Sequence, residues 1–467
     1  MKKLKIGFLP LFIKLYDDGA NGRSASRDVL EPYYEEMAKK FEAKGIEVVR
    51  TADFARTKAE FAEAVALFEK SKVDSIVTIH MAYNPSLECI DALAGTKLPL
   101  VVCDATTTYE FDPSQDPKYI SYCHGIHGVM DMCSLLIQRG KPFAIAAGHA
   151  DHSDVIDRVI GYVKAARAAT TLSGSVVGTI GGSFDGMGDF LIAPEKIKEL
   201  FGVKVVYANK EEMIELGKSV TEDEIKAEYE ENCKKFEDYG ELSLEDCRDT
   251  IISGLITRKW IKKHKMDAFT ANFLNIGLDE GIPTMPFMEA CKQMEKGTGY
   301  AGEGDILTAS ITGSLMRGFG EATFCEIFCP DWKGNTLILS HMGEMNIALC
   351  QKKPVAKKIK FVYGKHAVDP VVSYGAYKGG EAVYINICKD AEKYNLVITP
   401  VEMLNVDSEL YKYKVRGWLK PSMPVGKFLE ELSKNGATHH SSLVYGATVD
   451  ELVFYAKLIG VNPVVLK

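Results

Sequence analysis

The stretch TGYAGEGDILTASITGSLMRGFGEATFCEIFCPDWKGNTLILSHMGE, residues 298 to 344, contains a change in the hydrophobic pattern from helical to strand-like spacing. The predicted order of domains depends on this change. The first half of the stretch repeats apolar residues at helical spacing from Ile306 to Leu315, and its second half contains two short runs typical of strands. Glu303 lies between two glycines immediately before the helical pattern. A carboxylate is favoured at such a helix start, because free backbone N–H groups and the helix dipole attract negative charge.

The two strand-like runs, ATFCEIF and NTLILSHM, are joined by residues 330 to 335, which are typical of a turn. With the turn centred between Lys333 and Gly334, Glu326 faces His341 across the hairpin. Directly opposed residues have Cβ atoms roughly 4.5 to 5.5 Å apart, close enough for a carboxylate and an imidazole to share one metal ion. A surface pair or a hydrogen-bonded packing contact fits the same spacing, so spacing alone leaves both interpretations open.

A histidine doublet, His439-His440 in NGATHHSSL, is a candidate source of a further metal ligand. In an extended segment, neighbouring side chains point to opposite faces. We therefore expect only one of the two histidines to reach the ion.

Upstream of this stretch, strands and helices alternate along the chain. Residues 3 to 11 predict a first strand and residues 28 to 44 an amphipathic helix, and the cycle repeats as far as a strand at PFAIAAG. From about Ser173 the pattern restarts and continues to Glu303 and its two flanking glycines, Gly302 and Gly304. Alternating units with apolar, β-branched strands are typical of parallel sheets covered by helices. We therefore predict two doubly wound, Rossmann-like α/β domains, residues 1–170 and 171–315.

Downstream, the pattern changes to short strands with turns, and only the segment from Thr448 to Ile459 is predicted to be helical. The strand-like runs are TFCEIF, TLILSHM, KIKFVYG, AVYINICK, YNLVITPVEML and VRGWLK. Short strands at regular spacing favour an antiparallel barrel or sandwich. The predicted third domain, residues 316–467, is therefore β-rich and barrel-like, with a terminal helix.

The composition argues against several classes of partner. The 467-residue chain is 46% hydrophobic and has a net charge of −8, whereas nucleic-acid-binding proteins usually present a basic face, so no nucleic-acid partner is expected. No run approaches the ~18 apolar residues that span a bilayer, and MKKLKIGFLPLF predicts a first buried strand because it lacks a small-residue cleavage site. Eleven cysteines without zinc-ribbon spacing fit reduced thiols. We predict a cytoplasmic protein with no membrane partner.

Two other motifs have several interpretations. GGSFDGMGDF, residues 181 to 190, has the glycines of a phosphate loop but matches neither G-x-G-x-x-G nor a Walker sequence. A turn that presents Phe184 and Met187 to a neighbouring cleft is the preferred interpretation. His124 and His127 have i,i+3 spacing at a helix start, which fits metal binding, helix capping or a hydrogen bond to a ligand.

Taken together, the motifs resemble those of the L-arabinose isomerases, within the wider arabinose and fucose isomerase group. TGYAGEGDILTA, the glutamate that follows TFC, the histidine of LSHMGE and the doublet of ATHH are similar to the four metal-site motifs of that family, in the same order. Upstream, AFTANF resembles the family's AFTTTF, GGSFDGMGDF with FGVKV resembles its FGDNMR region, and HGIHGVMDM with RGKPFAIAAGH resembles its AHG and GH motifs. The resemblance covers nearly the whole chain and implies two α/β domains followed by a β-rich domain.

The resemblance also implies a metal-dependent aldose–ketose isomerase. Its divalent metal, typically Mn²⁺ but also Co²⁺ or Mg²⁺, would be held by Glu303, Glu326, His341 and His440, the second histidine of the doublet. Isomerisation moves a proton between C1 and C2, and a metal that binds O1 and O2 stabilises the enediolate. Glu303 and Glu326 would act in turn as base and acid. The family forms homo-trimers or homo-hexamers with sites near subunit boundaries.

Residues that would orient or select the sugar follow from the same resemblance. The sugar-orienting candidates are His439, His127, Phe273 and Met187. The family carries GSQHLYG near the N-terminus where this chain has LFIKLYD, so Ile13 and Lys14 replace its Gln and His. Lys14 and Arg23 could therefore read a group absent from arabinose, such as a sulfonate or phosphate on a hexose; a neutral surface role fits both residues equally.

Two alternative functions are consistent with parts of the pattern. A metal-dependent sugar dehydratase or epimerase would use the same enediolate, and product analysis separates it from an isomerase because dehydration releases water. A non-catalytic sugar-binding protein could also be built on two α/β domains, but the presence of all four ligand positions counts against it.

Overall fold

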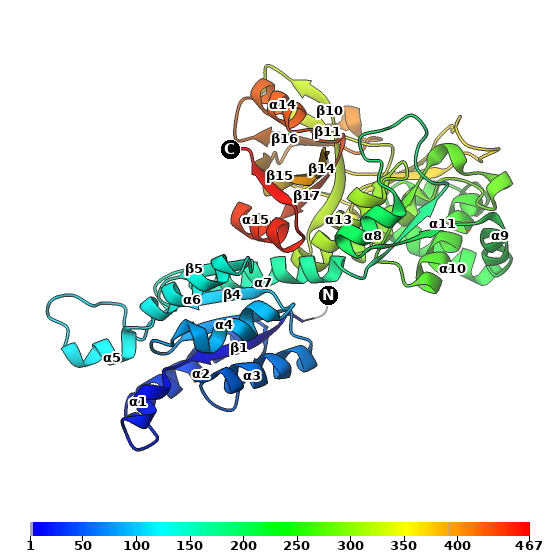
Figure 1. Cartoon of the computed structure of the whole chain (residues 1–467). Helices are drawn as coiled ribbons and strands as arrows, with labels where there is room; N and C mark the ends of the chain where they lie inside the picture. Colours follow the sequence, from blue (N-terminus) through cyan, green and yellow to red (C-terminus); the bar gives the residue numbers. More distant parts are fainter. Residues whose placement is uncertain (1–2, 392) are drawn as a thin grey trace. The chain divides into compact units, whose positions relative to one another are not determined.

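The computed structural model describes residues 3–391 and 393–467, and its contacts divide the chain into two compact units, Met1–Thr170 and Thr171–Lys467. Figure 1 labels helices and strands of both units where there is room. The division into three domains, with a second boundary at residue 315, stays a prediction.

The first unit is a parallel five-stranded sheet with helices on both faces. The strand order is β2-β1-β3-β4-β5 and every pair is parallel, which is the flavodoxin-like form of a doubly wound fold. The strands are β1 (Lys5–Leu11), β2 (Glu47–Arg50), β3 (Ser75–His80), β4 (Leu100–Asp104) and β5 (Phe143–Ala147). The helices are α1 (Lys14–Asp18), α2 (Arg27–Ala43), α3 (Lys58–Ser71), α4 (Ser86–Gly95), α5 (Ile120–Cys123), α6 (Ile126–Gln138) and α7 (Val155–Leu172), with a short 3-10 helix η1 (Pro117–Tyr119).

The alternation of side chains along β1 explains why helices cover both faces of this sheet. Leu9 lies in a core that also contains Phe61 and Phe68 of α3. Phe8 points to the opposite face and stacks on Tyr34 of α2, with 4.8 Å between the ring centroids. Both faces of the strand are therefore buried, which accounts for its nearly continuous apolar sequence.

The second unit begins with a parallel four-stranded sheet in the order β7-β6-β8-β9. Its strands are β6 (Val176–Ile180), β7 (Lys204–Tyr207), β8 (Ala268–Ala271) and β9 (Gly299–Gly302). The helices of this part are α8 (Pro194–Phe201), α9 (Lys210–Lys218), α10 (Glu222–Lys235), α11 (Leu244–His264), α12 (Phe287–Glu295) and α13 (Ile306–Phe319), with η2 (Tyr239–Glu241), η3 (Phe273–Asn275) and η4 (Leu278–Glu280). A Cβ atom at Gly299 would lie 2.4 Å from the backbone nitrogen of Gly313, so α13 packs directly on β9. These parallel α/β layers confirm the first part of the predicted fold class.

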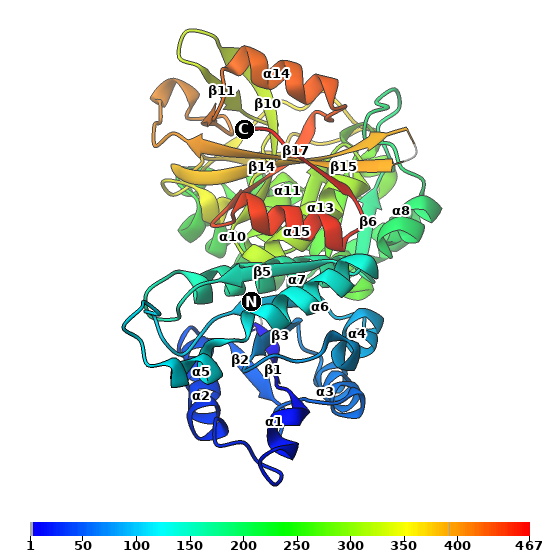
Figure 2. The ribbon, with the colours of Figure 1, turned by 60° about the vertical axis from the view of Figure 1, so that its left-hand side comes forward.

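The second unit continues into a closed antiparallel barrel, which confirms the barrel-like prediction. The barrel runs β14-β17-β10-β11-β16-β15 and closes because β15 also pairs with β14; β18 joins β15 in parallel. The barrel strands are β10 (Ala322–Asp331), β11 (Thr336–Leu339), β14 (Gly380–Asp390), β15 (Lys393–Met403), β16 (Gly417–Pro421) and β17 (His440–Tyr445). The remaining elements are β12 (Val355–Lys358), β13 (Val371–Tyr374), β18 (Asn462–Val465), α14 (Val425–Lys434), α15 (Val449–Leu458), η5 (Ile347–Leu349) and η6 (Glu409–Tyr411). Helix α15 packs against β15 and β18, as Figure 2 shows.

Two secondary-structure predictions for the C-terminal part are wrong. Helix α14 was not expected, although Val425, Phe428 and Leu432 recur at helical spacing and are buried. The strand predicted for KIKFVYG stops at Lys358. Beyond it, the N–H of Phe361 donates to the carboxylate of Asp369 at 2.8 Å instead of to a neighbouring strand.

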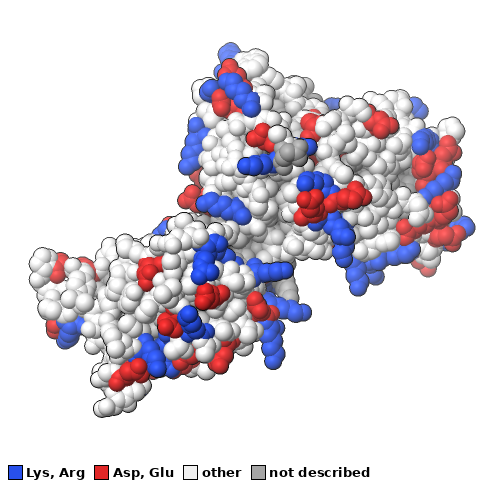
Figure 3. All heavy atoms as spheres, in the orientation of Figure 1, with Lys and Arg blue, Asp and Glu red and all other residues white. Residues whose placement is uncertain are grey.

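The surface carries interspersed charges. On the face drawn in Figure 3, acidic and basic side chains lie next to one another, and many are neighbours on one helix, such as Lys427 and Glu431 of α14 at 2.7 Å. All eleven cysteines are free thiols. Within residues 3–391 and 393–467, no helix has both the length and the apolar character needed to cross a membrane.

Candidate metal centre and active site

Glu303 lies in the turn between β9 and α13, in a left-handed backbone conformation. Its φ angle is +63°, which is uncommon for a residue with a side chain and is often found at functional sites. The N–H of Glu303 donates to the backbone oxygen of Ala271 at 3.0 Å. The helix is capped by Asp305, whose carboxylate accepts the N–H of Thr308 at 2.8 Å. The cap position that favours a carboxylate is therefore occupied by Asp305, and the Glu303 side chain is free to face the barrel.

Glu326 and His440 are directly paired residues on neighbouring strands of the barrel, β10 and β17. Residues opposed in this way place their side chains on the same face of the sheet. Nε2 of His341, which follows β11, lies 3.5 Å from Oε2 of Glu326. One hairpin and the distant strand β17 thus bring a carboxylate and two imidazoles together.

The predicted opposition of Glu326 and His341 is wrong by one residue. The hairpin pairs as predicted near its turn, but a β-bulge between Ile327 and Cys329 shifts the register. The N–H of Ser340 therefore donates to the backbone oxygen of Glu326, at 3.1 Å. Bulges re-aim side chains next to active sites, and this one leaves His341 beyond the paired strand but still within reach of Glu326.

Both histidines of the doublet approach Glu303, and the expectation that only one of them reaches a metal ion stays a prediction. Nε2 of His440 lies 3.3 Å, and Nε2 of His439 3.4 Å, from Oε2 of Glu303. Strand β17 begins at His440, so strand alternation does not apply to His439. Two groups of three side chains could hold a metal ion, and within each group the possible ligand atoms all lie within 4.8 Å of one another. These groups are Glu303 with His439 and His440, and Glu326 with His341 and His440.

A second set of carboxylates holds the buried imidazoles. Nδ1 of His440 is 3.0 Å from Oδ2 of Asp305, and Nδ1 of His341 is 2.6 Å from Oε2 of Glu344. The hydroxyl of Tyr300 donates to the other oxygen of Glu344 at 2.9 Å. With the Nδ1–H group of each ring donated to a carboxylate, both Nε2 atoms are directed into the cluster, the arrangement that orients histidine ligands of metals.

The cluster has the chemistry that a divalent cation requires. Nε2 of His440 is buried and has no hydrogen-bond partner in the described part of the chain, and an unpartnered buried polar atom is costly. Gly302 makes room for the rings, because a Cβ there would lie 3.0 Å from Cε1 of His341. Imidazole nitrogens and carboxylate oxygens together suit ions such as Mn²⁺, Co²⁺ or Zn²⁺. Glu303, Glu326, His341 and His440 could therefore hold such an ion.

The two glutamates of the cluster have opposite pKa shifts. Burial opposes ionisation of Glu303, but the hydrogen bond from His439 and the nearby ring of His440 outweigh it and lower the pKa of Glu303 to about 2. For Glu326, burial outweighs the attraction of His341 and His440, and its pKa is raised. Burial also disfavours the charged form of His440, yet the carboxylates of Asp305 and Glu303 raise its pKa to about 10. Glu303 therefore favours the ionised form, and Glu326 retains a proton to higher pH than an exposed glutamate.

The segment 181–190 forms a turn against the site, and none of its residues belongs to the two ligand groups. A Cβ at Gly304 would lie 2.1 Å from the backbone oxygen of Gly182, so the glycines allow this turn to touch the Glu303 loop. Phe273 packs on Phe184 with 5.3 Å between ring centroids. Met187 is half-buried in the same segment. The sugar-orienting roles of Phe273 and Met187 stay predictions.

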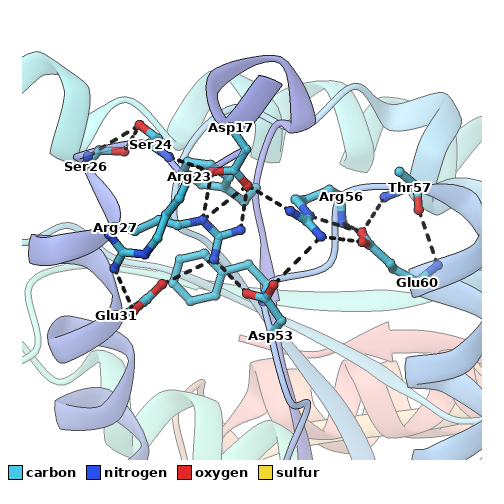
Figure 4. Close-up of polar contacts among 12 residues, drawn as sticks. Asp17, Arg23, Ser24, Ser26, Arg27, Glu31, Asp53, Arg56, Thr57 and Glu60 are labelled. Atoms are coloured by element: carbon cyan, nitrogen blue, oxygen red, sulfur yellow. Dashed lines mark hydrogen bonds and ion pairs between the residues drawn. The ribbon is translucent and has the colours of Figure 1, made fainter. Parts of the chain in front are cut away.

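Lys14 and Arg23 lie in the first unit, and both have acidic neighbours. Nζ of Lys14 is 3.8 Å from Oδ2 of Asp18. The guanidinium of Arg23 contacts Asp28 at 2.7 Å. It also contacts Glu31 at 3.1 Å (Figure 4). Recognition of an anionic sugar by these cations stays a prediction, and it would require Arg23 to exchange partners.

His127 also lies in the first unit, where its ring stacks on Tyr83 with 4.8 Å between centroids. Nε2 of His124 is 3.0 Å from the hydroxyl of Tyr16. Neither histidine belongs to a group of three possible metal ligands within the residues that the structure describes. The partner of His124 is a tyrosine of the same unit and not a ligand, so a hydrogen bond from either histidine to a ligand stays a prediction.

Comparisons with known proteins agree with this geometry. The model of the L-arabinose isomerase central domain matches residues 195–319, and that of the L-arabinose isomerase C-terminal domain matches residues 321–462. The L-arabinose isomerase of Oceanobacillus iheyensis is 24% identical over 426 residues, which is 85% of each chain. L-arabinose isomerase 2 of Bacillus licheniformis is 23% identical over 76% of each chain, and the enzyme of Aeromonas hydrophila is 24% identical over 82% of this chain and 79% of its own.

Two α/β layers and a closed barrel, together with these matches, define an enzyme that interconverts an aldose and a ketose. The chain belongs to the L-arabinose isomerase family, whose two domain models between them match most of the second unit. The wider link to the L-fucose isomerases stays a prediction.

Proposed function

We propose that the protein is a metal-dependent aldose–ketose isomerase that acts on a pentose or a hexose through an enediol intermediate. The observation that carries the proposal is the convergence of Glu303, Glu326, His341 and His440, with the buried imidazoles held by carboxylates at Nδ1. Those four side chains are the proposed ligands of a divalent ion, with Mn²⁺ as the first choice and Co²⁺ or Mg²⁺ as alternatives. When bound, the ion supplies positive charge for the sugar oxygens that become negative as the proton leaves.

The two glutamates are the proposed proton-transfer pair. Glu303, whose pKa is lowered to about 2, is ionised at neutral pH and can accept a proton from the carbon that loses it. Glu326, whose pKa is raised by burial, is the better of the two at holding a proton for delivery. Opposite shifts in two neighbouring carboxyl groups are typical of acid–base pairs, and the roles exchange when the reaction runs in reverse.

The substrate proposal rests on the relatives and on one difference from them. Relatives that align with most of this chain are named for L-arabinose, a pentose. Ile13 and Lys14 stand where the family resemblance places a Gln and a His, so a hexose with a substituent such as a sulfonate remains part of the proposal. We further propose a cytoplasmic homo-trimer or homo-hexamer, in keeping with the family.

Conversion of a panel of aldoses tests the proposal. The protein is stripped of metal and assayed with and without added Mn²⁺ in heavy water, and deuterium at C1 and C2 of the products is measured. Mn²⁺-dependent ketose formation with solvent deuterium in the product supports the isomerase. A product that has lost water, or bound Mn²⁺ without turnover of neutral or anionic aldoses, contradicts it.

A further inference from the structure

The segment 181–190, between β6 and α8, contacts the candidate metal centre at two separate places. Near its start, the N–H of Phe184 donates to the backbone oxygen of Glu303 at 2.9 Å. At its end, the ring of Phe190 stacks on that of His440, with 5.0 Å between centroids and 12° between planes. The segment therefore connects the Glu303 turn to the histidine doublet at the start of β17.

Asp189, the residue before Phe190, binds His439 twice. One carboxylate oxygen, Oδ2, accepts the backbone N–H of His439 at 3.0 Å and faces its Nδ1 at 2.7 Å. The other ring nitrogen, Nε2, lies 3.4 Å from Oε2 of Glu303. Each ring nitrogen of His439 therefore faces one carboxylate, and a half-turn of the ring about its Cβ–Cγ bond would lose both contacts.

We propose that Asp189 is a positioning residue for the isomerase reaction. It holds the ring of His439 with Nε2 directed at Glu303 and hence at the sugar oxygens beside that carboxylate. Two donors that converge on one ionised acceptor make charge-assisted hydrogen bonds, which are stronger than those between neutral groups. The effect on turnover rests on the proposed function, whereas the effect on the orientation of the ring does not.

This role differs from that of the carboxylates behind the proposed metal ligands. Asp305 and Glu344 face the Nδ1 atoms of His440 and His341, so their loss should weaken metal binding. Asp189 acts on His439, which is outside the proposed set of four ligands. Loss of Asp189 should therefore lower turnover while leaving the affinity for metal nearly intact.

Three variants of the full chain test the proposal: D189A, D189N and D185A. Asp185 is an exposed carboxylate of the same segment and serves as the matched control. For each variant, kcat and KM are measured on the aldose that the unmodified protein converts, and the Kd for Mn²⁺ is measured by calorimetry. A crystal structure of D189A with Mn²⁺ gives the orientation of the His439 ring.

We expect D189A to lose ~10–100-fold in kcat/KM while its Kd for Mn²⁺ stays within ~3-fold of that of the unmodified protein, as for loss of an outer hydrogen-bond partner. Its crystal structure should show the His439 ring turned away from Glu303. D189N keeps an oxygen acceptor for both donors and should recover most of the lost activity, and D185A should match the unmodified protein.

Full kcat/KM in D189A, or a loss explained entirely by weaker Mn²⁺ binding, would overturn the positioning role. If the unmodified protein shows no Mn²⁺-dependent isomerisation, the proposed function fails and the crystal structure alone decides. An unmoved His439 ring in D189A then overturns the proposal, and a turned ring supports it.

Discussion

Two buried clusters of charged side chains, one in each unit, differ in how their charges are matched. In the first unit, the carboxylate of Asp17 accepts hydrogen bonds from Arg27 and Arg56 and from the N–H of Ser24 (Figure 4). Arg27 in turn contacts Asp53 at 2.6 Å. Carboxylates and guanidinium groups alternate, and this holds the pKa of Asp17 at about 2 against the effect of burial.

In the second unit, the ion-pair partners of Glu303 and Glu326 among the described residues are histidines, and neither glutamate pairs there with an arginine or a lysine. These carboxylates face imidazoles whose Nδ1 atoms are bound to other carboxylates, and the Nε2 atoms point inward. Buried charge is stable only when it is paired or coordinates a metal. The first cluster is therefore complete by itself and joins segments of the fold, whereas the second has the donors for an added cation.

The largest expected effect comes from the two glutamates. E303Q and E326Q should each lower Mn²⁺-dependent kcat by ~10²–10⁴-fold, because each change removes an acid–base group and a charged ligand. The temperature at which half of the protein is unfolded should change little in either variant. E321Q, at an exposed glutamate just before β10, is the matched control, and retention of more than about a tenth of the activity in E303Q would contradict a catalytic role.

The next effect should appear in the first cluster and concern stability alone. Arg27 is 3% exposed, so R27A leaves buried carboxylates without a partner and should lower the free energy of unfolding by about 3–5 kcal/mol. R23A removes a neighbouring but half-exposed arginine and should have little effect. Denaturant unfolding of both variants measures the change in stability. If R27A changed the free energy of Mn²⁺ binding by as much as the free energy of unfolding, the first cluster would not serve stability alone.

A smaller effect is expected from the carboxylate behind His341. E344A removes the partner of Nδ1 and should weaken Mn²⁺ binding by ~10–100-fold, because the ring is then free to rotate or change its protonated nitrogen. Calorimetric titration of the metal-free protein measures the affinity. Unaltered Mn²⁺ affinity in a folded E344A protein would show that His341 is not a ligand.

The last expected effect is a dependence of metal affinity on pH, and it is small for each single pH unit. The pKa of His440 is raised to about 10, so at neutral pH its ring carries a proton that Mn²⁺ must displace. The affinity should therefore rise with pH, by up to ~10-fold per unit for one displaced proton, and should level off only near pH 10. Proton release measured in buffers of different ionisation enthalpy checks this, and an affinity that is constant between pH 6 and 9 would exclude His440 as a ligand.

The order of elements and the class of the sheets could be predicted because periodicity is a local property. Strands that are buried on both faces have runs of apolar residues. The glycines on either side of Glu303 indicated that this glutamate is not an ordinary core residue. Helix α14 carried the same kind of signal in Val425, Phe428 and Leu432, but it was missed among strands.

The details of the site could not be predicted because they depend on distant segments. The bulge between Ile327 and Cys329 has no clear mark in the sequence. The sequence contains local indications for two partners of the ligands. Asp305 stands just before a helical pattern, and Glu344 stands three residues after His341. Asp189 had none, because its contact with His439 joins residues 250 positions apart.

An anomalous difference map at the manganese edge, from crystals of the metal-free protein soaked in Mn²⁺, tests the central claim most directly. The account predicts one strong peak per chain, in contact with Glu303, Glu326 and the Nε2 atoms of His341 and His440. A peak at another place, or a fully ordered cluster without a peak at saturating Mn²⁺, would contradict it.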